Sequence, residues 1–245
     1  MVVNSRLEVT AETHVHFDSM LPEYRTSGGV HSSGRVVTAP TIMWVKGLDM
    51  LLDKLRVAGL EFSSVAGISG AGQQHGSVYW RRGADSLLAG LQPDRFLHDQ
   101  LGTAFSVHDS PIWMDSSTGR QCTLLEQAVG GAEQLAELTG SRAYERFTGA
   151  QIAKLVQERP EVYKATEKIS LVSSMAASLF TGRVVGTDWA DAGGMNLLEL
   201  RSRRWSETLL EAVGEGLGEK LGTPVNTSSV VGTVSEYMQE RWESR

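Results

Sequence analysis

The chain has 245 residues, a formal net charge of −6, and 41% hydrophobic and 21% charged residues, which is typical of a globular protein. Lysine and arginine gather no further than adjacent pairs, and a single cysteine, Cys122, excludes a disulfide framework and a cysteine-based zinc site. No apolar run is long enough to span a membrane, and the first residues lack the order of a signal peptide. We therefore expect a cytoplasmic protein with neither a nucleic-acid nor a membrane partner.

Hydrophobicity near the start of the chain alternates with period two over residues 7–17, which predicts a strand with one wet face. Only six residues precede this segment, so we expect its pairing partner to be distant or missing. The stretch 22–34 is rich in glycine and serine and indicates a loop. Apolar residues at helical spacing then predict a helix that is capped near Thr38 and closed by Gly59.

The remaining elements alternate between strand and helix patterns, which favours an α/β layer fold. In chain order we expect a strand at 65–68, a glycine-rich turn at 70–72, a strand at 77–80, helical turns and loop at 83–102, a strand at 111–114 followed by a cap at Ser116 or Ser117, helices at 118–128, 131–139, 149–158 and 160–166, an apolar segment at 170–180, a glycine-rich loop at 182–194, a helix around 205–213 and a late strand near 230–234.

The densest polar cluster runs from Ser69 to Gly76, where Gln74 and His75 stand among glycines after a predicted buried strand. Amide and imidazole groups offer several donors and acceptors to a polyhydroxylated ligand, and α/β folds place ligand loops after such strands. The alternative is a structural turn with satisfied polar groups. A dinucleotide fingerprint is not met because His75 takes the third glycine position, and Ala71 breaks a nucleophile elbow around Ser69.

Two further segments carry side chains of the kind that sugar sites use. Trp113 and Asp115 lie two residues apart on one predicted strand face, so the indole could pack against C–H groups while the carboxylate accepts from hydroxyls. A core tryptophan and a helix-capping aspartate explain the same pattern equally well. Arg146 could donate a fork of hydrogen bonds to hydroxyls or a phosphate, although a solvated arginine is the default interpretation.

A metal site is the weakest of these candidates. His14, His16 and Asp18 share a face of the predicted first strand, but no fourth ligand is evident and an exposed strand face explains them. The sequence also holds no Walker A pattern, protein-kinase loop or paired-carboxylate metal site. We therefore expect no metal ligands in this chain.

Several segments, in this order and spacing, resemble the FGGY family of carbohydrate kinases and within it the members that phosphorylate xylulose. They are GAGQQHGSVYW at 70–80, WMDSS at 113–117, TGSRAYERFTG at 139–149 and IAKL at 152–155. The resemblance extends over about residues 8–240. It implies an α/β, actin/hexokinase-like (ribonuclease H-like) fold with two domains around a cleft, and transfer of a phosphoryl group from ATP with Mg²⁺ to the 5-hydroxyl of D-xylulose.

The resemblance also implies roles for single residues of this chain. His75 matches the histidine that hydrogen-bonds the sugar, and Gln74 is its neighbour in the same turn. Arg146 matches a position that contacts the substrate, and Trp113 and Asp115 match a strand at the sugar site. These five residues form the expected substrate-binding set.

The sequence departs from the family pattern at both ends. We expect residues 1–235 to form the sugar-binding N-terminal domain without the family's first strand, and residues 236–245 to begin the continuation toward a C-terminal ATP-binding domain. The family's phosphate-binding turn and catalytic aspartate have no counterpart here, so no catalytic, nucleotide-binding or metal-binding residue is named. ATP and Mg²⁺ are expected of the longer family enzyme, and this chain alone is expected to be inactive.

Two alternatives stay open at this point. One is a non-catalytic sugar-binding or regulatory form that retains the pocket around His75. The other is a kinase for another pentulose. The sequence does not predict an oligomeric state.

Overall fold

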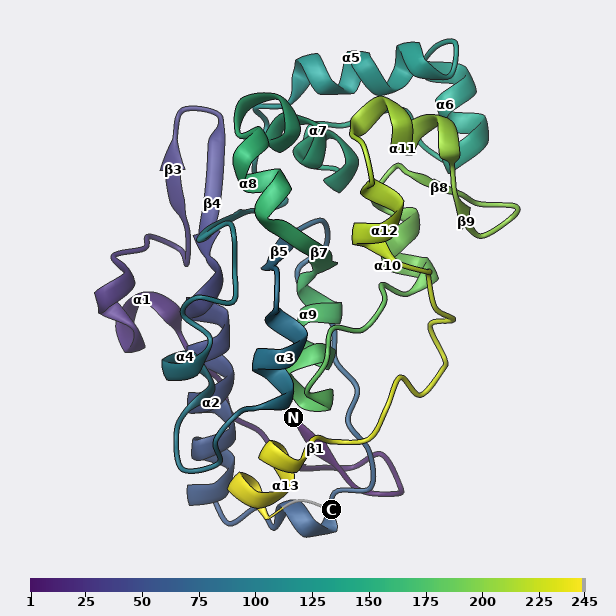
Figure 1. Ribbon diagram of the computed structural model, residues 1–245. Helices are drawn as coiled ribbons and strands as arrows, with labels where there is room; N and C mark the ends of the chain where they lie inside the picture. The colour runs from purple at the N-terminus through teal and green to yellow at the C-terminus, as the bar shows by residue number, and fades with distance from the viewer. Residues whose placement is uncertain (244–245) are drawn as a thin grey trace.

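The computed structural model describes residues 1–243 and combines helices with small antiparallel sheets (Figure 1). The longer helices are α2 (Thr41–Val57), α5 (Gly119–Ala128), α6 (Ala132–Thr139), α7 (Thr148–Glu158), α9 (Val172–Thr181), α11 (Glu207–Val213) and α13 (Glu236–Trp242). The shorter ones are α1 (Phe17–Met20), α3 (Ala84–Ala89), α4 (Leu97–Gln100), α8 (Pro160–Ala165), α10 (Trp189–Gly193), α12 (Leu217–Leu221) and the 3₁₀ turns η1 (Pro22–Tyr24) and η2 (Phe62–Ser64).

All paired strands in the described residues run antiparallel. The strands are β1 (Val2–Val3), β2 (Val9–Ala11), β3 (His31–Ser33), β4 (Val36–Pro40), β5 (Ser77–Arg81), β6 (Asp109–Pro111), β7 (Thr166–Leu171), β8 (Leu198–Glu199) and β9 (Arg204–Trp205). β4 pairs with both β3 and β6, whereas β5–β7, β1–β2 and β8–β9 form two-stranded sheets. The β5–β7 pair lies in the middle of the molecule, with helices above and below it in Figure 1.

The β5–β7 pair separates two hydrophobic cores. Tyr79 packs in one core with side chains of α5, α7 and α11, whereas its neighbours Val78 and Trp80 pack in the other with side chains of α2, α3 and α9. Successive residues of a strand point to opposite faces, so helices must cover both faces of this pair. The third core lies beside them and is formed by Leu21, Val37, Ala39, Met43 and Ile112.

Most helices lie where the sequence pattern predicts them. α2 ends at Val57, just before Gly59, and α5 to α8 occupy the four expected helical ranges within one or two residues. The cap of α2 is different, because Thr38 belongs to β4 and the helix starts after Pro40. Similarly, α5 starts after Thr118 and not after Ser116 or Ser117.

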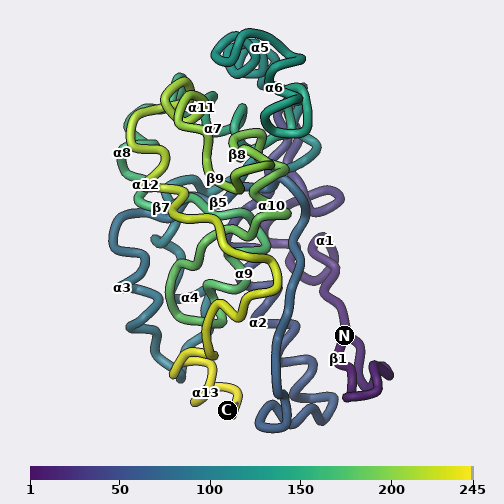
Figure 2. The backbone as a smooth tube through the Cα atoms, turned by 90° about the vertical axis from the view of Figure 1, so that its right-hand side faces the viewer, coloured from purple at the N-terminus to yellow at the C-terminus, as the bar shows by residue number. Residues whose placement is uncertain are grey.

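The expected strand over 7–17 is wrong in length and in its partner. Only β2 forms, and it pairs with β1 directly upstream; Figure 2 shows this pair on the side of the molecule opposite α3. Tertiary contacts explain the shortening. The Phe17 ring packs closely against two glycines, because a Cβ added to Gly29 or Gly47 would lie only 3.1 or 3.0 Å from it. The Asp18 carboxylate accepts from the Gly28 and Gly29 N–H groups at 2.6 and 2.9 Å.

The shared strand face of His14, His16 and Asp18, which was the weakest metal candidate in the sequence, therefore does not form. Asp18 also accepts from the Thr26 hydroxyl at 2.7 Å, so its carboxylate is used to hold the 26–29 turn. This hydrogen bond and those of the turn amides lower the pKa of Asp18.

Three other strand predictions are wrong. Residues 65–68 have no regular secondary structure because no strand lies beside them to take their hydrogen bonds. β6 ends at Pro111, after which the Asp115 N–H closes a turn on the Ile112 carbonyl at 2.9 Å. Residues 230–234 form no strand, and Val230 is 90% exposed. The glycine-rich turn therefore precedes β5 and does not follow a buried strand.

The C-terminal segments also differ from expectation in detail. The glycine-rich loop 182–194 contains the short helix α10, which Asp188 caps by accepting from the Ala190 and Asp191 N–H groups. Trp205 lies in β9, and α11 starts two residues later. α13 packs into the core beneath β5 and buries Trp242. Within residues 1–243, no helix has the length and apolar character to cross a membrane.

Candidate functional site

The glycine-rich turn before β5 packs directly against the first turn of α9. A Cβ added to Gly72 would lie 2.5 Å from the Ser173 nitrogen, and one added to Gly76 would lie 2.9 Å from Val172 Cγ2. The Val172 N–H also donates to the Gly76 carbonyl at 3.1 Å. Only glycine permits so close an approach, and this contact fixes Gln73, Gln74 and His75, the three residues between the glycines.

His75 is held in a strained conformation by several contacts. Its φ of +69° lies in the left-handed region, which costs a non-glycine residue about 1–2 kcal/mol. Its carbonyl accepts from the Thr148 hydroxyl at 3.2 Å, and its ring centre lies 4.8 Å from that of Phe147. The imidazole is only 8% exposed. Such strain persists only where the surroundings impose it, so the position of this ring is set by the fold.

The hydrogen bond of the imidazole defines its tautomer. The Nδ1–H donates to the Gly194 carbonyl at 3.0 Å, since a carbonyl can only accept. Burial lowers the pKa of His75, and the charge of Arg146 adds to this effect, although the Gly194 bond and Asp191 oppose it. The ring is therefore neutral near pH 7. Its Nε2, which bonds to no other described residue, is left as an acceptor for a hydroxyl group.

The end of α10 closes one side of this turn. A Cβ on Gly194 would lie 3.3 Å from His75 Cε1 and 3.5 Å from Gln74 Nε2, so a side chain here would crowd the His75 ring. The Ser173 hydroxyl donates to the Asp191 carboxylate and so ties α9 to α10. Gln74 is exposed at the surface of the turn, with its amide free to meet a ligand.

A cavity of about 260 Å³ lies between the segment after β6 and the segment before α7. It is lined by Trp113, Met114, Asp115, Ser116, Glu145 and Arg146. Trp113 is 47% exposed and Arg146 is also exposed, so an indole face and a guanidinium are both available to a ligand. This combination of an aromatic wall and a donor fork suits a small hydroxylated molecule.

Asp115 is buried and makes hydrogen bonds through both carboxylate oxygens. Oδ2 accepts from the Val37 N–H at 2.9 Å, while Oδ1 accepts from the Ser117 N–H at 2.9 Å, the Ser117 hydroxyl at 2.7 Å and Gln151 Nε2 at 2.8 Å. Gln151 Nε2 also donates to the Glu145 carbonyl at 2.9 Å. These contacts make Asp115 a brace that ties the segment after Trp113 to β4 and to α7 beside Arg146. Its direct contact with a sugar stays a prediction.

The five residues predicted from the sequence thus fall in two adjoining groups. Gln74 and His75 form one group, and Trp113, Asp115 and Arg146 line the cavity of the other. Arg146 connects them, because its charge acts on the His75 ring and its neighbour Phe147 packs against that ring.

Sequence reasoning missed the residues that position these groups: Phe147, Gln151, Asp191 and Gly194. Phe147 and Gln151 lie in or beside the YERFTG segment, where an aromatic side chain next to Arg146 was the available signal. Asp191 and Gly194 stood in a loop with no assigned role. Their proximity to the turn depends on a contact across more than a hundred residues, which no local pattern reveals.

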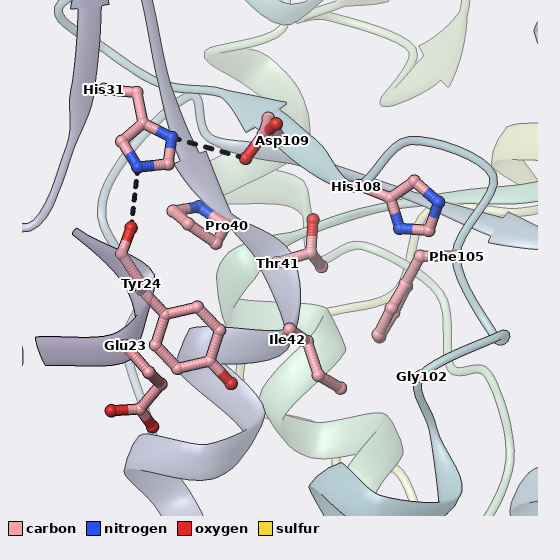
Figure 3. A pocket seen from close by; sticks show the side chains of 10 residues that line it. All are labelled: Glu23, Tyr24, His31, Pro40, Thr41, Ile42, Gly102, Phe105, His108 and Asp109. Carbon is pink, nitrogen blue, oxygen red and sulfur yellow. Dashed lines mark hydrogen bonds and ion pairs between the residues drawn. The ribbon is translucent and has the colours of Figure 1, made fainter. Parts of the chain in front are cut away.

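A second cavity, of about 250 Å³, lies between η1, the start of α2 and the segment before β6 (Figure 3). Figure 3 shows Tyr24, His31 and Asp109 on one side and Phe105 and His108 on the other. His31 Nε2 donates to the Tyr24 carbonyl at 2.8 Å, and its Nδ1 lies 3.6 Å from the Asp109 carboxylate. No residue of the sequence-predicted site lines this cavity.

Comparison with known proteins finds the carbohydrate kinase family that the sequence resembles. Residues 105–243 match the FGGY family of carbohydrate kinases, N-terminal domain. The chain is 54% identical over 244 residues to the xylulose kinase of Rattus norvegicus, covering 99% of this chain and 46% of that protein. Xylulose kinase 2 of Arabidopsis thaliana is 50% identical over 245 residues, with coverages of 98% and 44%. The chain thus spans less than half the length of these curated relatives.

Solved structures are similar in fold. The structure described as a xyloylose kinase from Brucella ovis has a TM-score of 0.71 at 21% identity, covering 88% of this chain and 40% of that chain. The xylulose kinase from Rhodospirillum rubrum has a TM-score of 0.71 at 16% identity, with coverages of 88% and 41%. Identities this low show the architecture and leave the chemistry to be argued from the site.

Proposed function

Because the chain belongs to the FGGY family of carbohydrate kinases, we propose that it is the sugar-binding part of an enzyme that phosphorylates D-xylulose to D-xylulose 5-phosphate. Its α/β, actin/hexokinase-like fold is the one expected from the sequence and is confirmed by the solved kinases. The activity would be that of a xylulokinase, EC 2.7.1.17. The names of the Rattus norvegicus and Arabidopsis thaliana relatives support this choice of sugar.

The observation that carries the proposal is the enforced position of the neutral His75 ring, which packs against Phe147 and feels the charge of Arg146, a residue that lines one cavity with Trp113. Nε2 of His75 would accept a hydrogen bond from a sugar hydroxyl, and the guanidinium of Arg146 would donate to hydroxyl oxygens. The exposed Trp113 ring would pack against the C–H groups of the sugar. Gln74 would add an amide contact at the rim. Together these groups would orient the sugar and displace water from it.

Kinases of this family use ATP, and we propose that Mg²⁺ accompanies it in the longer enzyme. When bound, Mg²⁺–ATP supplies the phosphoryl group. Within residues 1–243 there is no group of three histidine, cysteine, aspartate or glutamate side chains that could hold a metal ion. No residue described here is therefore assigned to ATP, to Mg²⁺ or to removal of the hydroxyl proton.

Titration calorimetry with D-xylulose tests the sugar-binding role. Removing a hydrogen bond to a charged group costs about 1.5–3 kcal/mol, so Arg146→Ala is expected to weaken binding at least about tenfold. Arg142→Ala is the matched control, because Arg142 is an exposed arginine in the same loop that lies over the Tyr144 ring. A folded chain that gives no binding heat, or equal affinities for both variants, would contradict the proposal.

The domain boundary and the activity of the isolated chain are part of the same proposal. Residues 1–235 would form the body of the sugar-binding domain in a cytoplasmic enzyme, and residues 236–245 would lead toward the ATP-binding domain. The first part of this second stretch, α13, still packs into the core of the sugar-binding domain, and residues 244–245 lie outside the described part of the chain. A coupled assay of ADP release is expected to show no xylulose-dependent turnover by this chain alone. Robust turnover would refute that statement, and a preference for ribulose over xylulose in the titrations would identify a kinase for another pentulose.

A further inference from the structure

His75 is held at its backbone and at its ring by two segments that also hold each other. Its carbonyl accepts from the Thr148 hydroxyl at 3.2 Å, and its Nδ1–H donates to the Gly194 carbonyl at 3.0 Å. The N–H of Gly149, next to Thr148, donates at 2.9 Å to the carbonyl of Met195, next to Gly194. These three hydrogen bonds close a ring that joins the glycine-rich turn, the first turn of α7 and the end of α10.

The contact between α7 and the end of α10 is closely packed. A Cβ added to Gly149 would lie 2.8 Å from the Met195 carbonyl oxygen. Thr148, Gly149 and Met195 are all buried, so neither segment has space to shift. The Thr148 hydroxyl and the Gly194 carbonyl are therefore held in fixed places, and His75 has to fit between them.

The bond from Thr148 acts on the strained part of His75. The φ of +69° is a conformation that a residue with a side chain keeps only where its surroundings stabilise it. The direction of the carbonyl and that of the Cα–Cβ bond are linked through the backbone dihedrals. Holding the carbonyl therefore also directs the imidazole toward Gly194, and the Phe147 ring packs against it with the ring centres 4.8 Å apart.

We propose that Thr148 is a positioning residue of the sugar site, whose hydroxyl keeps His75 in the left-handed conformation and so keeps Nδ1 on the Gly194 carbonyl and Nε2 as the acceptor. Gln151, in the same turn of α7, donates to Asp115 at 2.8 Å, so one helix start sets both groups of the candidate site. The effect on sugar binding rests on the proposed function, whereas the effect on the ring does not.

NMR of the isotope-labelled imidazole nitrogens at about pH 7.5 reads the state of the ring without any sugar. The His75 signals are identified by their absence from His75→Asn, and in the parent they should show one neutral tautomer with its proton on Nδ1. Thr148→Val keeps the shape of the side chain without the donor and should shift these signals toward a mixture of tautomers. Thr148→Ser keeps the hydroxyl and should restore the signals of the parent.

Thr166→Val is the matched control for the NMR experiment. Thr166 is also buried, and its hydroxyl donates to the Val162 carbonyl at 2.8 Å, at the end of β7 far from the glycine-rich turn. This variant should lose stability and leave the His75 signals unchanged. If Thr148→Val does not fold, Thr148→Ala removes the same hydroxyl without filling its place and carries the test.

Calorimetry with D-xylulose adds the functional readout. Thr148→Val should weaken binding about fivefold, the loss expected for one hydrogen bond, and Thr148→Ser should bind like the parent. A parent that binds no sugar would contradict the proposed function, and the nitrogen signals would still decide the role of Thr148. A folded variant without the Thr148 hydroxyl that keeps the His75 signals of the parent would overturn the positioning role, even if its melting temperature falls.

Discussion

Asp115→Asn isolates the role of the buried carboxylate that braces the candidate sugar site. Four donor groups converge on its two oxygens, from Val37, Ser117 and Gln151. An asparagine has the same shape but replaces one acceptor oxygen with an NH₂ donor. In its best orientation this NH₂ faces the Val37 N–H, so two donors oppose each other at a site where the aspartate is only 2% exposed.

The cost follows from these contacts. One lost hydrogen bond with a buried unsatisfied N–H costs about 1–3 kcal/mol, and the bonds that remain lose the assistance of the negative charge. We therefore expect Asp115→Asn to lower the free energy of unfolding by about 2–3 kcal/mol. Asp115→Ala removes the acceptor for all four donors and is expected to cost about 3–5 kcal/mol.

Urea unfolding followed by tryptophan fluorescence measures both values. Asp53→Asn is the control, because Asp53 is a partly exposed aspartate whose ion pair with Arg56 lies at the surface, and it should change stability by less than about 0.5 kcal/mol. If Asp115→Asn unfolds at the same urea concentration as the parent, the carboxylate is not the acceptor that holds the cavity together. A sugar contact would then be the better account of Asp115.

Three further predictions concern the glycine-rich turn. Gly72→Ala should lower the melting temperature by several degrees because its Cβ would collide with Ser173, whereas Gly67→Ala, with open space around it, should leave the melting temperature unchanged; equal effects would refute the packing argument. Gly194→Ala should weaken D-xylulose binding in calorimetry by crowding the His75 ring, and an unchanged affinity would contradict this. Folding lowers the pKa of His75 below its ordinary value near 6.5, so the folded chain binds a proton there less readily than the unfolded chain. The free energy of unfolding should therefore be highest above about pH 6.5 and should fall as the pH drops below that value. Urea unfolding at about pH 7.5 and about pH 5.5 measures this loss, and His75→Asn should show a smaller difference in the free energy of unfolding between the two pH values than the parent. An equal difference in both proteins would exclude His75 as its source.

The helices were largely predictable, and the candidate site could be proposed from the sequence, because their signals are local. Apolar spacing of 3.6 residues marks α2 and α5 to α8, and the glycine-rich turn marks Gln74 and His75. Strands were less predictable. Residues 65–68 have a strand pattern, but a strand forms only where another one lies beside it, and the pattern does not report its neighbour.

The role of Asp115 shows a second limit. The sequence left a ligand and a structural residue equally open, and the decision depends on donors from Val37, Ser117 and Gln151, which lie in three separate segments. The positioning of His75 by Gly194 is equally non-local. Motifs selected the side chains of the candidate site, whose contact with a sugar stays a prediction, whereas the hydrogen bonds that orient them depend on the folded chain.

The strand β5, which follows the glycine-rich turn, lies between two hydrophobic cores. Tyr79 is fully buried on one side of β5 and Trp80 on the other, where its indole N–H donates to the Ser170 hydroxyl at 2.8 Å. Neither core can open without exposing this strand, so the amides of β5 and β7 should exchange with solvent only when the whole chain unfolds. A sugar bound at His75, two residues before β5, would then slow hydrogen exchange in both cores that pack against β5.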